Sequence, residues 1–265
     1  MDFVAFSIAN INIYWYGIII AAALVVALGI TKLNCNFHHE EFTPIIELFV
    51  WAIPIGIIGA RVVYLIQHPN NYKSFASIFH IWQGGLSIYG AAIALCILSL
   101  IYFKLKDLDI WYWLDLLVPA IMLVITVMQI TNFVLQLSIG APFGPDLPND
   151  HRLAEYIEFK YRPTGFENYQ YFQPVAIYQA AASLAIFVLT LLLTLLNRYW
   201  HFLANGTLLL IVIFLVASTR FWAGFMYLAV DKTDILHPAQ WVSLGFIGLT
   251  IIGYVIKKWR SCKLN

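Results

Sequence analysis

Seven apolar stretches divide this chain, and each is long enough to cross a lipid bilayer as a helix, which needs about 20 mostly apolar residues. They lie at 13–33, 44–65, 86–103, 117–137, 175–196, 207–229 and 240–256. None of them alternates between apolar and polar residues as a membrane β-barrel strand does. The sequence therefore predicts an all-α integral membrane protein, with seven transmembrane helices in a single membrane domain of residues 1–265.

The composition excludes a soluble protein and several kinds of site. Apolar residues make up 62% of the chain and charged residues 11%, against about 25% charged residues in soluble domains. The net charge of +1 provides no basic stripe for a nucleic acid. Because the three cysteines have no short spacing, we predict free thiols rather than a disulfide framework or a zinc site. We expect no metal ion and no cofactor.

The positive charges predict the orientation of the chain in the membrane. One set of connections collects Lys32, Lys104, Lys106, Arg198, Lys257, Lys258, Arg260 and Lys263. The opposite set holds Lys73 and Lys232 in short loops, and three basic residues in one long loop. Because short cytoplasmic loops are enriched in Lys and Arg, the N-terminus is expected outside and the C-terminus in the cytoplasm.

Two connections on the predicted outer side are unusual. Residues 140–173 form a loop rich in Pro and Gly with charges of both signs, and long ordered loops are usually functional. The connection His68–Gln83 contains the apolar stretch Phe75–Trp82, which is too short to span. We expect that stretch to lie along the membrane interface.

Two arginines, Arg61 and Arg220, fall inside predicted spans. Charged residues in a span are costly unless they face a partner or a polar cavity. A guanidinium binds phosphate through two hydrogen bonds, so a phospholipid headgroup is a candidate partner. The alternatives are a pair with Glu47 or Asp115, hydrogen bonds to backbone carbonyls, or extension of the side chain to the interface.

Further polar residues mark the third and fourth spans. Gln129 and Asn132 are three residues apart, so they share one face of a helix. Tyr89 follows Gly84-Gly85 at the start of the third span. These glycines would let the backbone approach either a ligand or a neighbouring helix, and the sequence leaves both explanations open.

Seven short segments, one for each span, carry a recognisable pattern. They are Tyr14-Trp15-Tyr16-Gly17, Gly59-Ala60-Arg61 with Tyr64, Trp82 through Gly90, Asn132-Phe133 with Gly140, Gln173-Pro174 with Tyr178, Arg220-Phe221, and Gln240 through Ser243. In this order they resemble the motifs of the prolipoprotein diacylglyceryl transferase family. Its members are seven-span bacterial enzymes that move a diacylglyceryl group from phosphatidylglycerol to the thiol of a lipobox cysteine.

The resemblance implies a location, partners and a site. The location is the bacterial cytoplasmic (inner) membrane, and the partners are an anionic phospholipid and a prolipoprotein signal segment. The residues at lipid-binding positions are Tyr16, Arg61, Gln129, Asn132 and Gly140, and those at catalytic positions are Tyr89 and Arg220.

Several positions depart from the family pattern. In Gly-Arg-x-Gly-Asn-Phe-x-Asn-x-Glu-x-x-Gly, Gln129 stands at the Arg and Leu137 at the Glu. Gly224 stands at the Glu of Arg-Phe-x-x-Glu-Phe, and Tyr89 at the His of Trp-x-Gly-Gly-x-x-x-His-Gly-Gly. Gln173 takes the place of His in His-Pro-x-x-x-Tyr-Glu. The chemistry needs a base for the thiol and cations for the phosphate, and a tyrosine with a pKa near 10 is a poor base at neutral pH.

The sequence therefore leaves two main functions open. One is an active diacylglyceryl transferase in lipoprotein biogenesis, with an altered proton relay. The alternative is a catalytically lapsed paralogue that binds a lipid or a lipoprotein segment, or serves as a structural subunit of a membrane protein complex. A transporter or channel is disfavoured, because we find no inverted repeat and few acids within the spans.

Overall fold

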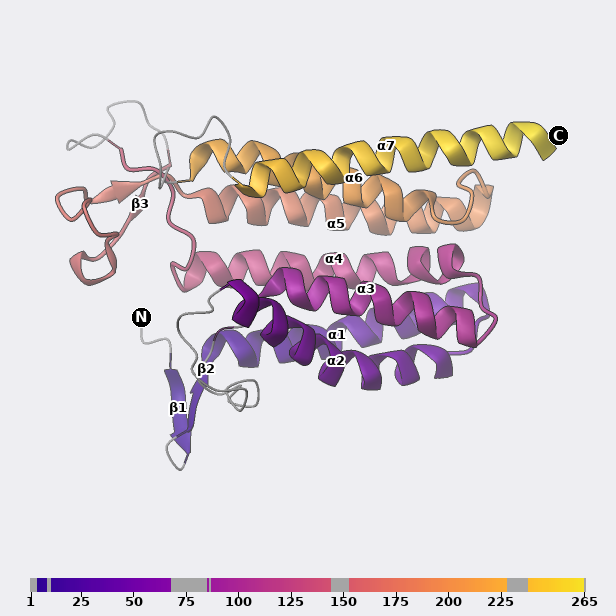
Figure 1. Ribbon diagram of the computed structural model, residues 1–265, viewed down its shortest axis with the longest axis horizontal. Helices are drawn as coiled ribbons and strands as arrows, with labels where there is room; N and C mark the ends of the chain where they lie inside the picture. The colour runs from indigo at the N-terminus through magenta and orange to yellow at the C-terminus, as the bar shows by residue number, and fades with distance from the viewer. Residues whose placement is uncertain are drawn as a thin grey trace. The chain divides into compact units, whose positions relative to one another are not determined.

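The computed structural model describes residues 4–8, 11–67, 85, 87–143, 153–227 and 238–264 (Figure 1). Seven helices in these ranges are long and apolar enough to cross a membrane, which confirms the seven predicted spans. They are α1 (Trp15–His38), α2 (Thr43–Gln67), α3 (Ile88–Leu105), α4 (Ile110–Val134), α5 (Val175–Trp200), α6 (Thr207–Ala223) and α7 (Pro238–Leu264).

The chain packs as two compact units. Residues 4–14 and 29–116 form one, here called the α2–α3 unit. Residues 1–3, 15–28 and 117–265 form the other, here called the α4–α7 unit. The boundary between them falls within helices α1 and α4.

Two glycines bring α2 and α3 into close contact in the α2–α3 unit. A Cβ atom added to Gly59 would lie 2.3 Å from Ala94 Cβ, and one added to Gly90 would lie 2.3 Å from the Gly59 carbonyl oxygen. Small residues allow helix backbones to approach closely in a membrane, where packing drives association. Of the two explanations for the glycines near the third span, helix packing therefore holds at Gly90.

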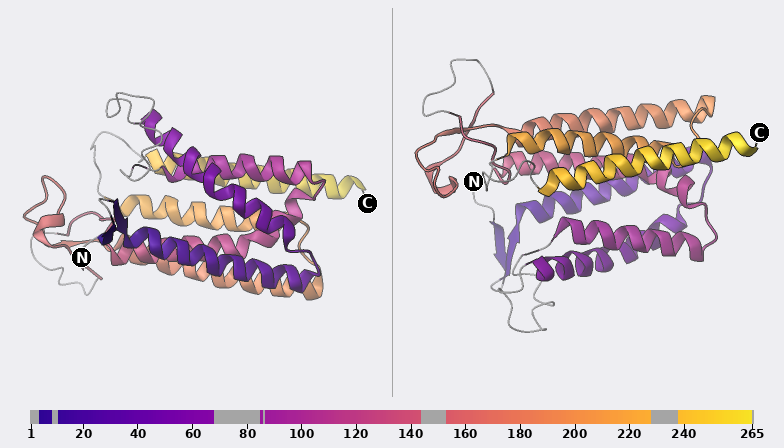
Figure 2. Two further views of the ribbon diagram at one scale, coloured as in Figure 1. Left: turned by 90° about the horizontal axis from the view of Figure 1, so that it is seen from below. Right: turned by 45° about the horizontal axis from the view of Figure 1, so that its top comes forward.

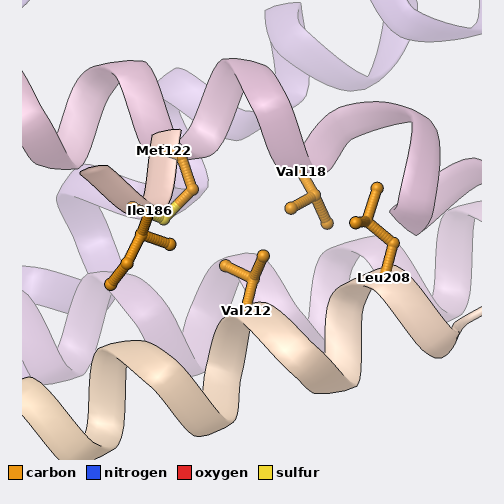
Figure 3. Close-up of a cluster of buried hydrophobic side chains, with 5 residues drawn as sticks. All are labelled: Val118, Met122, Ile186, Leu208 and Val212. Carbon is orange, nitrogen blue, oxygen red and sulfur yellow. The ribbon is translucent and has the colours of Figure 1, made fainter. Parts of the chain in front are cut away.

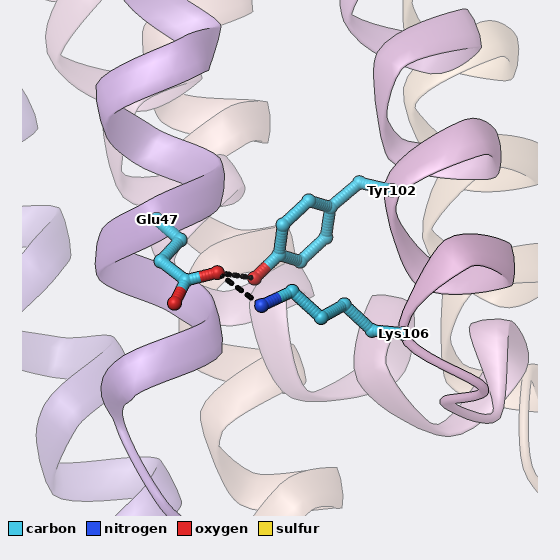
Figure 4. Close-up of polar contacts among 3 residues, drawn as sticks. All are labelled: Glu47, Tyr102 and Lys106. Carbon is cyan, nitrogen blue, oxygen red and sulfur yellow. Dashed lines mark hydrogen bonds and ion pairs between the residues drawn. The ribbon is translucent and has the colours of Figure 1, made fainter.

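A polar cluster joins the other ends of the same two helices. Glu47 of α2 accepts a hydrogen bond from Tyr102 Oη at 2.9 Å and pairs with Lys106 Nζ at 2.6 Å (Figure 4). Glu47 was one of the carboxylates considered for a buried arginine. Lys106 is its partner instead.

Apolar side chains of three helices form a core in the α4–α7 unit (Figure 3). They are Val118 and Met122 of α4, Ile186 of α5, and Leu208 and Val212 of α6. Each is at most 6% exposed. α7 lies beside α6 in both Figure 1 and Figure 2.

Two features differ from the predicted spans. Strands β1 (Val4–Ile8) and β2 (Ile11–Tyr14) form an antiparallel hairpin before α1, which no sequence pattern indicated. α4 begins at Ile110 rather than at residue 117, because the Asp109 carboxylate accepts a hydrogen bond from the Trp111 backbone N–H and so caps the helix. As a result Trp113 lies inside the helix, where it is 4% exposed and stacks on Phe103.

Several expectations remain predictions. The stretch Phe75–Trp82 lies outside the described residues. The orientation of the termini and the single-domain organisation follow from the sequence argument alone. Of the three cysteines, Cys35 and Cys96 are free.

The glycine contact between α2 and α3 predicts a sensitive position. Gly59→Ala should lower the free energy of unfolding by about 1–3 kcal/mol, because the added methyl overlaps Ala94. Thermal unfolding of the protein in detergent measures this loss. Gly29→Ala in α1 is the matched control, because a Cβ there meets nothing within 4 Å. Equal midpoints for the two variants would contradict the packing argument.

Candidate functional site

A small ladder of backbone hydrogen bonds joins the ends of α4, α5 and α6. Ala141 N–H donates to the Met226 carbonyl at 2.8 Å, and Gln173 N–H donates to the Ala141 carbonyl at 2.9 Å. Just before Gln173, strand β4 (Tyr171–Phe172) pairs in antiparallel fashion with strand β3 (Glu155–Tyr156). This region is called the loop end of the α4–α7 unit below.

Gly140 is the position on which the ladder depends. It is buried, it bridges Tyr227, and a Cβ atom added to it would lie 2.3 Å from the Gln173 carbonyl oxygen. Only a residue without a side chain lets these backbones approach so closely. The structure thus gives Gly140 a backbone contact, whereas its predicted lipid-binding role stays a prediction.

A network of amide side chains lies on α4 and α5, close to the ladder. Gln129 Nε2 donates to Gln179 Oε1 at 2.9 Å, and Asn132 Nδ2 donates to Gln129 Oε1 at 3.1 Å. Tyr227 Oη, 3.5 Å from the same Gln179 oxygen, adds a weaker bond. Gln129 is 3% exposed and Gln179 is 8% exposed. Gln129 and Asn132 are two predicted site residues that a hydrogen bond joins.

Gln179 was missed by the sequence argument, although a signal for it existed. It follows Tyr178 and therefore stands at the Glu of His-Pro-x-x-x-Tyr-Glu. Its partner Gln129 stands at the Arg of another motif. In the structure Gln129 and Gln179 are hydrogen-bonded to each other. Two neutral amides therefore stand where the family motifs have an arginine and a glutamate.

Arg220 lies in the last turn of α6 rather than in mid-span. The side chain is half-buried, and in the described part of the chain no hydrogen bond or ion pair joins its guanidinium to another residue. No Asp or Glu occurs in the spans of this unit. The C-terminal end of a helix favours a nearby cation, so the position is tolerable without a carboxylate.

The residue one turn after Arg220 is closely packed. A Cβ atom added to Gly224 would lie 2.4 Å from Gln240 Cγ, and the Gln240 amide donates to the Phe221 carbonyl at 3.2 Å. Gln240 is 3% exposed. The space that a glutamate at 224 would need is therefore filled from α7.

Arg61 differs from Arg220 because the protein itself satisfies it. The side chain is 1% exposed, donates from Nη1 to the Gly85 carbonyl at 3.0 Å, and lies over the Tyr64 ring at 5.9 Å. Gly85 has a φ of +78° and packs against Tyr64. The backbone-carbonyl alternative thus accounts for part of the hydrogen bonding of Arg61, which holds the segment before α3.

The remaining predicted positions differ in their exposure. Tyr16 is half-buried in the first turn of α1, and Tyr89 is 43% exposed near the start of α3. Leu137, just beyond α4, is 48% exposed. Arg61 and Tyr89 belong to the α2–α3 unit, and the other predicted site residues belong to the α4–α7 unit.

A comparison with known proteins identifies the family of the chain. The family profile described as prolipoprotein diacylglyceryl transferase matches residues 3–256. The chain belongs to the prolipoprotein diacylglyceryl transferase family. It is therefore a multi-pass protein of the bacterial cytoplasmic membrane.

Curated relatives in this family match the chain over nearly its full length. The phosphatidylglycerol–prolipoprotein diacylglyceryl transferase 1 of Clostridium perfringens is 30% identical over 99% of this chain and 97% of its own length. The phosphatidylglycerol–prolipoprotein diacylglyceryl transferase of Listeria monocytogenes is 30% identical over 100% of this chain and 92% of its own length. The one from Synechocystis is 29% identical over 98% of this chain and 94% of its own.

In this member of the prolipoprotein diacylglyceryl transferase family, the loop end adds a carboxylate that none of the quoted motifs contains. Glu155 in β3 is 8% exposed, and its Oε2 is buried without a hydrogen-bond partner. The neighbouring Tyr156 carbonyl accepts a hydrogen bond from Gln136 Nε2 at 3.1 Å, which ties β3 to the end of α4. Burial raises the pKa of Glu155 to about 7.

The raised pKa predicts a pH dependence of stability. The folded protein holds the Glu155 proton up to about pH 7, whereas an unfolded chain releases it near the ordinary value of 4.5. Stability should therefore fall as the pH rises from about 4.5 to about 7, and stay level above that. Glu155→Gln should remove this fall and stabilise the protein at pH 8 by on the order of 1 kcal/mol, or about 2–4 °C.

Thermal unfolding at pH 5 and at pH 8 measures the effect. Glu158→Gln is the control, because Glu158 lies in the same loop and is exposed. Two results together would contradict a buried, protonated Glu155. The wild type would be as stable at pH 8 as Glu155→Gln, and the stability of the two proteins would depend on pH in the same way.

Proposed function

We propose that this chain binds the phosphate group of an anionic phospholipid such as phosphatidylglycerol, and that it is a lapsed diacylglyceryl transferase retained for that binding. The observation that carries the proposal is Arg220. Its guanidinium has no partner within the described ranges, whereas the charges expected at 129, 137 and 224 are absent. Family membership supports transferase function in lipoprotein biogenesis, and the lapse is our inference from these substitutions.

The binding half of the proposal follows from the chemistry of Arg220. A guanidinium stays charged at any physiological pH and matches two phosphate oxygens. The last turn of α6 is near the end of a span, the depth at which headgroup phosphates lie. The relatives are named as phosphatidylglycerol–prolipoprotein diacylglyceryl transferases, and phosphatidylglycerol carries such a phosphate.

The transfer half follows from how charge moves in the reaction. The thiolate of a lipobox cysteine forms a C–S bond to the diacylglyceryl carbon, and the C–O bond to phosphate breaks. A diester monoanion thereby becomes glycerol phosphate, a monoester with one more negative charge. A cation that meets only this developing charge accelerates the reaction without tightening substrate binding. Without an arginine at 129, we expect a loss of about 10²–10³-fold.

The proton of the thiol presents a second difficulty. Tyr89 stands at the family's histidine, and a phenol is a poorer general base than an imidazole. Because catalytic groups act together, restoring a single group should recover little activity.

A working transferase is the second candidate, and Glu155 favours it. A buried carboxylate with a pKa of about 7 is better matched than tyrosine to accepting the thiol proton near neutral pH. Its neighbour Tyr156 is tied to Gln136 of the α4 end, one residue before Leu137, where the family pattern has Glu. In that case Glu155→Gln would abolish turnover.

The experiment measures binding and transfer on the same preparation. Purified protein is assayed for bound phospholipid and for transfer of radiolabelled diacylglyceryl from phosphatidylglycerol to a lipobox peptide. We expect co-purified phosphatidylglycerol and no turnover above a no-protein blank. Arg220→Ala should reduce bound lipid about tenfold, because a charge-assisted hydrogen bond contributes roughly 1.5–3 kcal/mol.

Three variants complete the test. Arg198→Ala removes an equal charge at the opposite end of α5 and should leave lipid binding unchanged. Tyr89→His/Gln129→Arg asks whether two restored groups return any turnover. Wild-type turnover that is lost in Glu155→Gln would establish the second candidate, and lipid binding that survives Arg220→Ala would overturn the first.

A further inference from the structure

The two-stranded sheet of the loop end has two unlike faces. Across the antiparallel pair, Glu155 lies opposite Phe172 and Tyr156 lies opposite Tyr171. Because side chains alternate along a strand, Glu155 and Phe172 share one face and the two tyrosines share the other. The first face is buried, whereas Tyr156 is 51% exposed and its ring packs edge-on against Tyr171 with centroids 5.8 Å apart. The sheet therefore presents a pair of tyrosines to its surroundings.

A phenylalanine and an arginine extend the exposed side of the sheet. Phe159, in the short 3-10 turn that follows β3, is 70% exposed. The guanidinium carbon of Arg162 lies 5.5 Å from the centre of the Phe159 ring and 6.0 Å from that of Tyr156. Tyr156, Phe159, Arg162 and Tyr171 are called the aromatic face below.

Arg162 holds the aromatic face in place while its charge stays unneutralised. Its Nε donates to the Ile157 carbonyl at 3.0 Å, and its Nη1 donates to the Glu167 carbonyl at 2.7 Å. Lys160, whose ammonium lies 5.4 Å from the centre of the Tyr161 ring, is exposed. No ion pair joins either cation to a carboxylate among the residues that the structure describes.

The acids of the same loop limit the net charge of this surface. Glu158 is exposed, and the Glu167 carboxylate accepts a hydrogen bond from the Gly165 N–H at 3.0 Å. They equal Lys160 and Arg162 in number. The surface thus lacks the excess charge that attracts a strongly acidic or basic protein, and its distinguishing feature is exposed aromatic area.

The attachment of β3 to α4 fixes the depth of the aromatic face. With 25 residues, α4 is about 37 Å long, more than the roughly 30 Å of a hydrocarbon core, so its end reaches the headgroup layer. Gln136, two residues beyond α4, donates from Nε2 to the Tyr156 carbonyl at 3.1 Å. Val134 and Leu137 beside it are 45% and 48% exposed, so exposed apolar side chains continue up to this junction. Figure 1 shows β3 beyond the same ends of α4 and α5.

We propose that the aromatic face is a membrane anchor, which lies in the headgroup layer and packs on lipid. Tyrosine rings favour this layer because they are apolar at one end and polar at the other. Phe159 would leave water there, and an arginine finds headgroup phosphates. The anchor holds the loop end against the bilayer. It is independent of the phosphate binding proposed for Arg220.

The backbone of β3 disfavours the other occupant, an extended peptide added as a further strand. The Ile157 N–H donates to the Gln170 carbonyl at 3.1 Å, so this residue faces β4. The preceding Tyr156 carbonyl therefore points to the outer edge, where strand addition would use it. Gln136 already occupies that carbonyl, which leaves a lipid surface as the partner that needs no backbone pairing.

The test measures the depth of the aromatic face in a bilayer. An NBD fluorophore is attached to Phe159→Cys or to Thr164→Cys in full-length protein that carries Cys96→Ala/Cys262→Ala, and the fully buried Cys35 is kept. The protein is placed in nanodiscs of zwitterionic lipid, part of which carries a nitroxide quencher near the headgroup. NBD at 159 should be quenched at least about threefold more than at 164, since interfacial side chains lie about 5–10 Å into the headgroup–acyl boundary.

Two variants show whether the face itself, rather than the fluorophore, holds the loop down. Tyr156→Ser removes an exposed ring and keeps the backbone bond to Gln136, so it should lower the quenching at 159 by about twofold or more. Tyr199→Ser is the matched control. Tyr199 is 74% exposed in the last turn of α5, at the opposite end of the unit, and its replacement should leave the quenching unchanged.

Equal quenching at 159 and 164 would overturn the anchor, and so would an equal effect of Tyr156→Ser and Tyr199→Ser. Quenching at 159 that falls when a lipobox peptide is added would overturn it too, because the face would then serve a peptide. The nanodiscs contain no phosphatidylglycerol, so failure of the phosphate binding proposed for Arg220 leaves this result unaffected.

Discussion

The close approach of three backbones at Gly140 is the constraint on which the loop end depends. The backbone groups in the terminal turns of a helix have no partners within that helix and must find them elsewhere. Here the residues after α4, before α5 and after α6 satisfy one another through backbone hydrogen bonds. A side chain at 140 would separate them. The ladder also places Tyr227 where its hydroxyl reaches Gln179, so the backbone contact fixes the amide network.

The seven spans could be predicted because their signal is local. Each needs only a sufficient length of apolar residues, and all seven helices occur where the sequence places them. The β1–β2 hairpin and the early start of α4 were missed for a related reason. The hairpin depends on cross-strand pairing that no short motif specifies, and α4 begins early because of one capping carboxylate, Asp109.

The candidate site was predictable only in part, because motifs name positions and not contacts. Asn132 and Gln129 were placed on one helix face, and the structure joins them. Gln179 was not identified, although the same motif comparison marked its position. Arg61 and Arg220 looked equivalent in the sequence, yet one is bound to the Gly85 carbonyl and the other has no partner in the described ranges. Only tertiary contacts distinguish two such arginines.

Two of the substitutions, Gln129 and Gln179, form a matched pair, and this bears on what the site can still do. Gln129 contacts Gln179, and Gln240 occupies the space beside Gly224. A cation and an anion replaced together leave no unpaired charge behind, so the fold bears little cost from either change. Substrate binding needs only one cation for a phosphodiester, and Arg220 remains. Catalysis needs a further cation as the leaving phosphate gains charge. Under the function proposed above, the neutral pair removes stabilisation of the transition state while Arg220 still supports the ground state, which is the combination expected of a transferase fold retained for binding.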